Sequence, residues 1–467
     1  MNPSINEVAA RVDTLWVLLA GVLVFFMQAG FLLLEVGFSR MKNAGTIVAK
    51  IIANLSICAV CYWAVGFALA FGATKMPAAG HTAGWFAGND GWFLYHLGSV
   101  PLPAMAASAA NPAAKFFFQF AFCAVSLAIV WGTTLERIKF GAYLIYAVVF
   151  SAVIYPVISH WIFGGGWLQV NFGMQDFAGS TVIHLIGATG AFAALLLLGP
   201  RQGKYGRDGK PNVIPGHSMP LVGLGVLILF LGWFGFNPGS TLSAANGRFA
   251  EVAIVTLLGG ATGALGAMAT IYLITRSFDI GMTGNGVVAG LVAITAPSGY
   301  VEYWAAVPVG LVAGVLVVVC VIAIDRRLDD PIGALSSHGV CGVWGTLTCG
   351  LFTSPRLASY NAVGKPGLVY TGSFHQLGAQ AIGIVAAFTS VFAVSFLVFF
   401  AIKAAHGLRV KPEDERYGLD IVEHGMWGYP EQFMPVPGSI YHQPAGPAQR
   451  PAPRAVPLGI AAARENA

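Results

Sequence analysis

Two pairs of ionisable residues interrupt long apolar stretches of this 467-residue chain. Asp176 is followed eight residues later by His184, and Asp330 is followed at the same separation by His338. An ionisable side chain inside a membrane helix is costly to hold there, so it is a candidate for function by default. Neutral imidazoles donate and accept hydrogen bonds, and burial favours the neutral form. Together the two units predict a lane for a small, neutral, hydrogen-bonding molecule, with any proton relayed separately. The alternative is that each histidine merely hydrogen-bonds a neighbouring helix.

The composition is that of a polytopic membrane protein. Hydrophobic residues make up 56% of the chain and charged residues 10%, whereas soluble domains carry about 25% charged residues. The net charge of +5 is modest and comes without the basic, aromatic-rich stripe of a nucleic-acid surface. Cys58 and Cys61 form a Cys-x-x-Cys pair in an apolar segment without polar ligands, which disfavours a redox or metal site. We therefore expect no enzyme, no cofactor and no metal.

Eleven segments reach the length needed to cross a bilayer, about 20 apolar residues. The chain therefore predicts an all-α fold of eleven transmembrane helices within residues 1–408. The segments are 14–38, 45–72, 116–135, 139–161, 178–199, 217–236, 250–275, 281–298, 302–324, 335–354 and 376–404.

Lysine and arginine concentrate in the loops after odd-numbered segments, which predicts that those loops are cytoplasmic. The protein would then cross the cell (inner) membrane with its N-terminus outside and its C-terminus in the cytoplasm. From residue 409 the chain becomes charged, and from residue 430 it is rich in proline and alanine. We expect a cytoplasmic tail over 409–467, of which 430–467 is largely disordered. The basic residues after odd-numbered segments are Arg40, Lys42, Arg137, Lys139, Arg201, Lys204, Arg207, Lys210, Arg276, Arg326 and Arg327; those after even-numbered segments are Lys75, Lys115, Arg248, Arg356 and Lys365.

The two Asp–His units enter the membrane from opposite faces. Asp176 lies at the outer end of the fifth segment, and Asp330 lies at the inner end of the tenth. Eight residues of helix span about 12 Å and the bilayer core is about 30 Å thick, so both histidines are expected near the midplane. Five segments separate the units, which predicts a 5+5 inverted repeat with one further C-terminal helix. The imidazoles should touch at the repeat interface.

Aromatic residues cluster at three predicted outer ends, in 116–122, 160–166 and 232–240. These runs form either an interfacial aromatic belt or a vestibule whose rings, with the Ser240 hydroxyl, hold a small cation. A cation–π contact contributes about 0.5–2 kcal/mol, whereas a charge at the bilayer centre costs at least about 2.5–3.5 kcal/mol. Rings at the mouth would therefore collect a cation without carrying it across.

Several motifs closely resemble those of the ammonium transporter (Amt/MEP/Rh) family, and its bacterial Amt branch fits best. The likeness runs from about residue 13 to residue 425. The motifs are Asp176-Phe-Ala-Gly-Ser-Thr-x-x-His184, Gly232-Trp-Phe-Gly-Phe-Asn-x-Gly-Ser240, Asp329-Asp-Pro with His338-Gly-Val-Cys-Gly, and Leu419-Asp-Ile-Val-Glu-His-Gly425.

The resemblance implies transport of ammonium or ammonia, with methylammonium as an analogue, by a homotrimer with one pore per subunit. The tail segment 409–429 would be regulatory, and a PII-type signalling protein would bind the cytoplasmic face. Two other functions stay open: an ammonium sensor of the same fold that signals through such a partner, and a general cation channel, which the lack of an Asp or Glu ring disfavours. The implied pore residues, from the outer mouth inward, are a recruitment site of Phe118, Phe122, Phe163 and Ser240; a gate of Phe122 and Phe236; a lane of His184, His338 and Trp233; and structural support from Asp176.

One position departs from the family pattern. Relatives commonly carry tryptophan before the Gly-Gly-Gly of the loop after the fourth helix, where this chain has Phe163. A phenyl ring attracts a cation more weakly than an indole. Weaker recruitment is therefore expected, unless Trp161 or Trp167 occupies the vacant place.

Overall fold

The computed structural model describes residues 3–73, 83–244 and 247–433. These residues are almost entirely helical, with two isolated β-bridges and no sheet among them. Nine of the described helices are long and apolar enough to cross a membrane. The shorter α11 and the joined pair η8 and α13 fill the other two predicted positions. The predicted all-α polytopic architecture with eleven membrane helices is confirmed.

Several membrane helices are built from more than one helical stretch. In chain order the eleven are α1 (Ile5–Phe38); α2 (Ala44–Cys61), η2 (Tyr62–Gly66) and α3 (Phe67–Phe71); α4 (Pro112–Thr133); α5 (Phe140–Val149), η5 (Phe150–Ile154) and α6 (Tyr155–Ile162); η6 (Ser180–Leu185) and α8 (Ile186–Leu198); α9 (Met219–Gly239); α10 (Arg248–Thr275); α11 (Ile280–Thr295); α12 (Tyr303–Asp325); η8 (Leu335–Val340) and α13 (Cys341–Phe352); and α16 (His375–Ala405). The shorter connecting helices are η1 (Met41–Asn43), η3 (Trp92–Leu94), η4 (Pro103–Met105), α7 (Trp167–Phe172), η7 (Pro297–Gly299), α14 (Pro355–Asn361), α15 (Leu368–Thr371), α17 (Pro412–Tyr417), α18 (Leu419–His424) and α19 (Pro430–Phe433).

The first helix starts earlier than its apolar stretch. We predicted a start at residue 14, but α1 begins at Ile5. The Ser4 hydroxyl accepts from the Glu7 amide at 3.3 Å, and the Glu7 carboxylate accepts from the Ser4 amide at 2.7 Å. This capping box satisfies the first amides of the helix. It lets α1 extend over residues 5–13, ahead of the predicted apolar segment.

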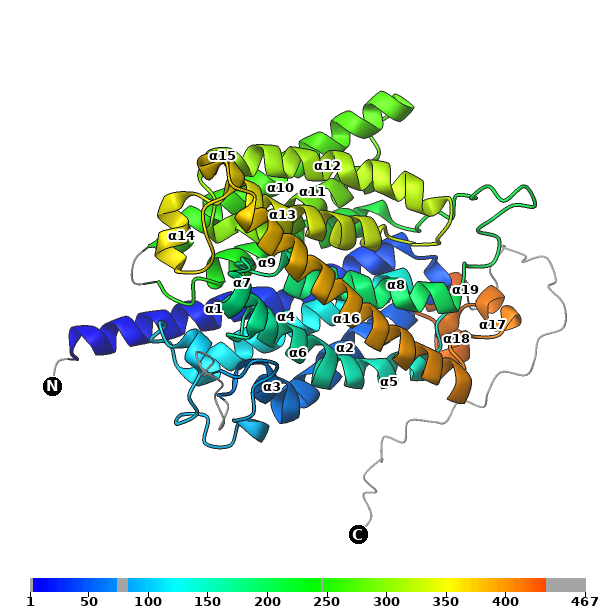
Figure 1. Cartoon of the computed structure of the whole chain (residues 1–467). Helices are drawn as coiled ribbons and strands as arrows, with labels where there is room; N and C mark the ends of the chain where they lie inside the picture. Colours follow the sequence, from blue (N-terminus) through cyan, green and yellow to red (C-terminus); the bar gives the residue numbers. More distant parts are fainter. Residues whose placement is uncertain (1–2, 74–82, 245–246, 434–467) are drawn as a thin grey trace, which may run out of the picture.

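Equivalent helices of the two halves pack against each other. The first helices of the two halves, α1 and α9, run along each other. The fifth helices are η6 with α8 in the first half and η8 with α13 in the second, and these also contact each other. A Cβ at Gly225 of α9 would lie only 2.6 Å from the Leu34 nitrogen of α1, so glycine permits this close approach. The pairing is that of an inverted repeat. The eleventh membrane helix, α16, lies at the periphery of the bundle and packs across α8 and α13 (Figure 1).

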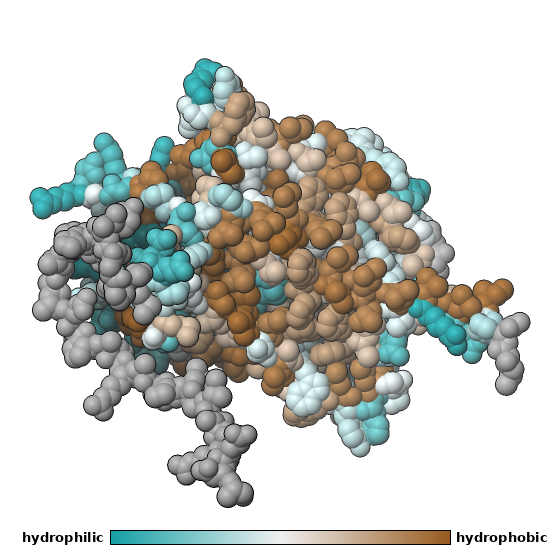
Figure 2. All heavy atoms as spheres, turned by 180° about the vertical axis from the view of Figure 1, so that it is seen from behind, coloured by the Kyte–Doolittle hydropathy of each residue, from teal (hydrophilic) through white to brown (hydrophobic). Residues whose placement is uncertain are grey.

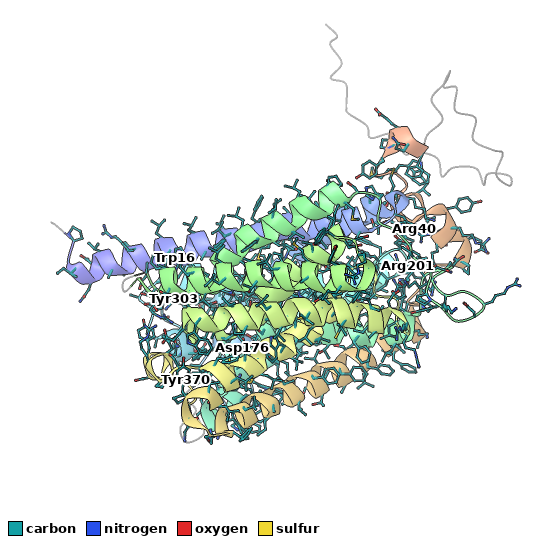
Figure 3. The ribbon with its side chains drawn as sticks, turned by 90° about the horizontal axis from the view of Figure 1, so that it is seen from above. Trp16, Arg40, Asp176, Arg201, Tyr303 and Tyr370 are labelled. Atoms are coloured by element: carbon teal, nitrogen blue, oxygen red, sulfur yellow. The ribbon has the colours of Figure 1, made fainter. Side chains whose placement is uncertain are left out.

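The two ends of the bundle carry different residues. Trp16, Asp176 and Tyr303 lie toward one end, which we call the outer end, and Arg40 and Arg201 lie toward the opposite, inner end (Figure 3). Between them a broad apolar face covers the middle of the molecule (Figure 2). Exposed apolar side chains of the membrane helices include Leu227, Leu265 and Leu397. An apolar surface of this width is what a bilayer requires.

Candidate functional site

A cavity of about 150 Å³ opens at the outer end of the bundle. All four residues of the predicted recruitment site line it: Phe118, Phe122, Phe163 and Ser240. The side chains come from α4, from the turn after α6 and from the end of α9. Ser240 donates its hydroxyl to the Phe236 carbonyl at 2.9 Å, which leaves its oxygen lone pairs available to a donor such as a protonated amine.

Two phenylalanine rings stack at this outer cavity, and one of them, Phe122, lines it. The ring centroids of Phe122 and Phe236 are 4.2 Å apart with an interplanar angle of 27°. Phe118 stands next to Phe122, with centroids 4.5 Å apart. All three side chains are buried. The structure thus brings the predicted gate residues into direct stacking contact, with the recruitment residue Phe118 beside them.

The two histidines meet beneath the phenylalanine pair. Nδ1 of His184 lies 3.1 Å from Nδ1 of His338, and the rings are 5.2 Å apart at 16°. The predicted contact between the imidazoles is therefore confirmed. One ring must donate through Nδ1 and the other must accept through Nδ1, so the two neutral rings are held in opposite tautomers. His184 Nε2 has no hydrogen-bond partner among the described residues, which leaves it free for a small polar guest.

Trp233, the third residue of the predicted lane, packs beside the histidine pair. Its ring stacks on His184 at 5.3 Å and lies 5.5 Å from Phe236. Its indole N–H donates to the Thr295 hydroxyl at 2.9 Å, which fixes the ring plane. His184 also lies 5.6 Å from Phe236. Rings therefore follow one another without a gap from the outer cavity to the histidine pair.

Asp176 caps the helix that carries His184. Its two carboxylate oxygens accept from four backbone amides, those of Gly179, Ser180, Thr181 and Val182, at 2.8 to 3.0 Å. These amides form the N-terminus of η6, where donors are otherwise unpaired and a negative charge is favoured. Asp176 also lines the outer cavity.

The second Asp–His unit has the same kind of helix cap as the first, but with fewer hydrogen bonds. Asp330 precedes η8 and accepts from the Leu335 amide at 2.7 Å. Our estimate of 12 Å between each acid and its histidine assumed continuous helix and is wrong in that respect. Each acid instead lies in a turn before the helix, and each histidine lies on a π-helical turn, η6 or η8. π-turns are frequent at functional sites.

Several residues of this region were not singled out from the sequence. Phe71, Gln119 and Tyr300 also line the outer cavity, and the signal for them was an aromatic or polar residue near a predicted outer helix end. Glu35 and Lys50 are fully buried within two membrane helices, and neither the Glu35 oxygens nor Lys50 Nζ has a hydrogen-bond partner among the described residues. An ionisable side chain inside a membrane helix is a candidate for function, and this holds for Glu35 and Lys50 as it does for the two Asp–His units.

The two tryptophans near Phe163 in the sequence, Trp161 and Trp167, contact other residues. Trp161 donates its indole N–H to the Phe86 carbonyl at 2.9 Å, and Trp167 stacks on Trp85 at 5.8 Å. Neither is among the residues that line the outer cavity, whereas Phe163 is. The structure thus places a phenyl ring, and no indole, at this part of the wall.

A buried ion-pair network ties the inner end together. Asp329 accepts from the Arg201 amide at 2.7 Å and from its guanidinium at 2.8 and 2.9 Å, and Arg137 lies 3.9 Å away. Burial acts to raise the pKa of Asp329, but the Arg201 hydrogen bonds and the two guanidinium charges outweigh it and lower the pKa to about 2. Asp329 is therefore ionised at any physiological pH.

The tail segment docks on this inner end. Asp420 of α18 accepts from the Gly45 and Thr46 amides at 2.9 and 2.8 Å, at the N-terminus of α2. Glu415 of α17 accepts from the Gln202 amide at 2.7 Å and pairs with Arg409 at 2.7 Å. The first part of the predicted tail is thus held against the membrane domain. The remainder of the stretch expected to be disordered, 434–467, lies outside the described residues.

Comparison with known proteins places this geometry in a family. Residues 15–429 match the model of the Ammonium Transporter Family. The chain is 42% identical over 432 residues to ammonium transporter Amt2 of Archaeoglobus fulgidus, covering 90% of this chain and 88% of the relative. It is 37% identical over 429 residues to a putative ammonium transporter of Synechocystis, with 90% of each chain covered.

Solved structures agree with the sequence relatives. The fold matches a protein named Sensor Amt Protein with a TM-score of 0.81 at 35% identity, covering 90% of this chain and 100% of the other. It matches Mep2 of Candida albicans with a TM-score of 0.77 at 27% identity, covering 88% and 89%. The chain belongs to the ammonium transporter family.

Proposed function

We propose that this protein carries ammonium or ammonia across the cell membrane through the ring-lined path described above. The observation that carries the proposal is the unbroken sequence of rings from the outer cavity, past Phe122 and Phe236, to the contact between His184 and His338. An aromatic mouth followed by neutral hydrogen-bonding imidazoles suits a guest that arrives as a small cation and crosses the centre as a neutral molecule.

Each part of the path has one physical task. Phe118, Phe122, Phe163 and the Ser240 oxygen hold ammonium by cation–π contact and a hydrogen bond. The stacked rings of Phe122 and Phe236 keep the outer cavity closed until one of them moves. Below them, desolvation disfavours a charge. His184 and His338 offer a guest hydrogen bonds, and Trp233 contributes an apolar ring to the wall. Asp176 keeps η6, and with it His184, in place.

Substitution of the paired imidazoles tests the proposal. His184→Ala and His338→Ala should each strongly change uptake of labelled methylammonium, or its selectivity over larger cations, in proteoliposomes while the protein still folds. His375→Ala removes an exposed histidine at the outer start of α16 and should leave both unchanged. Current recorded alongside uptake distinguishes net charge movement from movement of a neutral molecule. Unchanged uptake and unchanged selectivity in both variants would exclude the histidine lane.

A sensory role is the second candidate. It is favoured by the match to the protein named Sensor Amt Protein, whose whole chain is covered. A sensor would bind methylammonium in the outer cavity and yet give no uptake in proteoliposomes. Binding without uptake in the wild-type protein would therefore favour this role over transport.

We also propose the assembly and regulation that the family resemblance implies. The protein would form a homotrimer with one pore per subunit, the inner end would face the cytoplasm, and a PII-type protein would bind there. The docked tail over 409–429 supports a regulatory contact, because it joins α2 and the loop after α8 at that end.

A further inference from the structure

A line of buried polar side chains runs along α2, apart from the ring-lined path. Thr46, Lys50, Asn54, Cys58 and Tyr62 follow one another at every fourth residue, which places them on one face of the helix. All of them are buried. Sixteen residues of helix span about 24 Å, most of a bilayer core about 30 Å thick. The α2 polar line, as we call these residues, therefore reaches from the inner end far toward the outer end.

Two opposite charges meet on this line without a hydrogen bond between them. Lys50 Nζ and both carboxylate oxygens of Glu35 are fully buried and have no hydrogen-bond partner in the described part of the chain. Their charges act on each other where α1 packs on α2. Charged groups inside a membrane protein are paired or hydrated, because an uncompensated buried charge is costly. Bridging water would satisfy both groups.

The neutral groups of the line also have hydrogen-bonding capacity to spare. Asn54 donates to Gln28 Oε1 at 3.1 Å and accepts from the Trp131 indole at 3.2 Å, so it is already paired. Thr46 Oγ1, Gln28 Nε2 and the Tyr62 hydroxyl have no partner among the described residues. Each of these groups can hold a water, as buried polar groups without a protein partner ordinarily do.

The outer end of the line lies near the outer cavity. The ring of Tyr155 is 6.3 Å from that of Tyr62, and its hydroxyl likewise lacks a partner within the described ranges. Asp176, which lines the outer cavity, is close enough for its charge to act on Tyr155. Gln119 lines the same cavity, and its buried Oε1 has no partner in the residues described. Polar groups therefore continue from the outer cavity to Tyr62.

Two π-turns border the line where Tyr62 and Tyr155 meet. η2 begins at Tyr62, η5 ends one residue before Tyr155, and the two turns contact each other. A π-turn is rare and often marks a functional site. The histidine lane accounts for η6 and η8 but not for this second pair.

The second half of the inverted repeat shows that the fold does not require these features. α10 and α12 are the counterparts of α2 and of the fourth membrane helix, and both are uninterrupted α-helices. They pack through glycine, since a Cβ at Gly310 of α12 would lie 2.4 Å from the Gly259 carbonyl oxygen of α10. The polar residues and π-turns of the first half thus need an explanation other than the shared fold.

We propose that the α2 polar line conducts protons, through waters held by its polar groups, between the outer cavity and the inner end. The inference rests on the proposed transport. In the outer cavity an N–H bond of ammonium breaks, its electron pair stays on nitrogen, and the proton passes to water at Gln119. Ammonia crosses by the histidine lane, and a proton leaving the line forms a new N–H bond with it at the inner end. One positive charge is thereby carried per ammonium although no ion crosses the lane.

Glu35 balances the charge of Lys50 in this scheme. An isolated Lys50 would be an electrostatic barrier to a proton, and the carboxylate removes that barrier. Each water, hydroxyl or thiol of the line both donates and accepts hydrogen bonds. Each can therefore accept one proton and pass on another.

Current and labelled methylammonium uptake, recorded together in proteoliposomes of the full-length protein, test the line. The wild type should carry one positive charge per methylammonium. Glu35→Gln leaves Lys50 unbalanced, so the charge carried per methylammonium should fall about ten-fold or more, while uptake continues as neutral methylamine. Glu35→Gln with Lys50→Gln removes both charges and should regain most of the current.

A matched pair of threonine variants checks the hydroxyl groups. Thr46→Val removes a hydroxyl of the line and should lower the charge carried per methylammonium. Thr262→Val makes the same change on α10, the counterpart helix, where the hydroxyl donates to carbonyls of its own helix, and should leave that ratio at the wild-type value. These two variants keep the test decisive if the charge variants do not fold.

Several results would overturn the proposal. They are an unchanged ratio in Glu35→Gln and Thr46→Val, equal losses of current and uptake, and uptake without current in the wild type. Failure of the double variant to regain current would assign the loss in Glu35→Gln to damaged packing instead.

Electron cryo-microscopy of the protein in nanodiscs tests the hydration of the line apart from transport. Ordered waters on Glu35, Lys50 and Tyr62 are expected. A direct contact between Glu35 and Lys50 with no water beside it would refute a proton path. Absence of uptake in the wild type, with these waters present, would refute the proposed transport but not the hydrated line.

Discussion

Asp176→Asn is the most direct test of how the histidine-bearing helix is held. Each carboxylate oxygen of Asp176 accepts two backbone amides at the start of η6. Asparagine keeps one oxygen and replaces the other with an NH₂ group, which donates only. Two buried amides then lose their acceptor and face another donor. An unsatisfied buried polar group costs about 1–3 kcal/mol, so the change should cost about 2–6 kcal/mol.

The inverted repeat supplies a matched control in Asp330→Asn. Oδ2 of Asp330 accepts one amide, that of Leu335, and Oδ1 has no hydrogen-bond partner among the described residues. Asparagine can keep the single hydrogen bond through its carbonyl and place its NH₂ group where Oδ1 lies. Weakening a hydrogen bond from a charged to a neutral acceptor costs on the order of 1 kcal/mol. The same substitution in the same kind of turn should therefore be much milder.

Thermal unfolding of the purified protein in detergent compares the two variants. Asp176→Asn should lower the unfolding midpoint well below that of Asp330→Asn, which should stay near the wild type. Methylammonium uptake, measured well below both midpoints, should fall strongly only in Asp176→Asn, because His184 lies on the helix that loses its cap. Equal shifts of the two midpoints, or a larger shift for Asp330→Asn, would refute the hydrogen-bond reasoning.

Three further predictions follow from the outer cavity, the inner network and the tail. Phe163→Trp should lower the half-saturating methylammonium concentration about two- to five-fold with little change in maximal rate, because an exposed cation–π contact contributes about 0.5–1 kcal/mol; no effect, with weaker affinity in Trp161→Ala, would show that Trp161 occupies the place. Asp329→Asn should destabilise the protein by about 3–5 kcal/mol, because the buried guanidinium groups of Arg137 and Arg201 lose the charge of Asp329. The low pKa of Asp329 means that the wild type keeps this stabilisation above its usual value of 3.8 and loses it as pH falls toward 2. The midpoints of the two proteins should therefore differ at pH 7 and converge in acid, and a constant difference would contradict the assignment. Deletion of residues 411–467 should leave the membrane domain folded but alter uptake or abolish PII capture, and wild-type behaviour in both assays would count against a regulatory tail.

The membrane architecture was predictable because the apolar segments are long enough to cross a bilayer. The inverted arrangement was also within reach, since Asp176–His184 and Asp330–His338 share one spacing with an odd number of segments between them. The contact between the imidazoles follows from that symmetry. These features depend on the length and apolarity of the segments and on whether an odd number of them separates the two units. All of these are properties of the sequence alone.

Local turns and long-range contacts were harder to predict. The capping box of Ser4 and Glu7 was visible as Ser-x-x-Glu, yet an apolar window ends where the charges begin and so places the start of α1 too late. The π-turns around His184 and His338 have no periodicity that distinguishes them from ordinary helix. The contact of Asp420 with the Gly45 amide joins residues 375 positions apart, and no local pattern specifies it.

The two halves of the repeat differ in what surrounds their caps. Asp176 is fixed by four amides of its own segment and borders the outer cavity. Asp330 holds one amide, but its neighbour Asp329 is bound by Arg201, and the next residue, Gln202, donates to Glu415 of the tail. The inner cap and the tail therefore belong to one hydrogen-bonded network, whereas the outer cap stands apart from it. A change in the tail should consequently affect the helix of His338 and the maximal rate of methylammonium uptake. It should leave the half-saturating methylammonium concentration unchanged, because that concentration depends on the outer cavity.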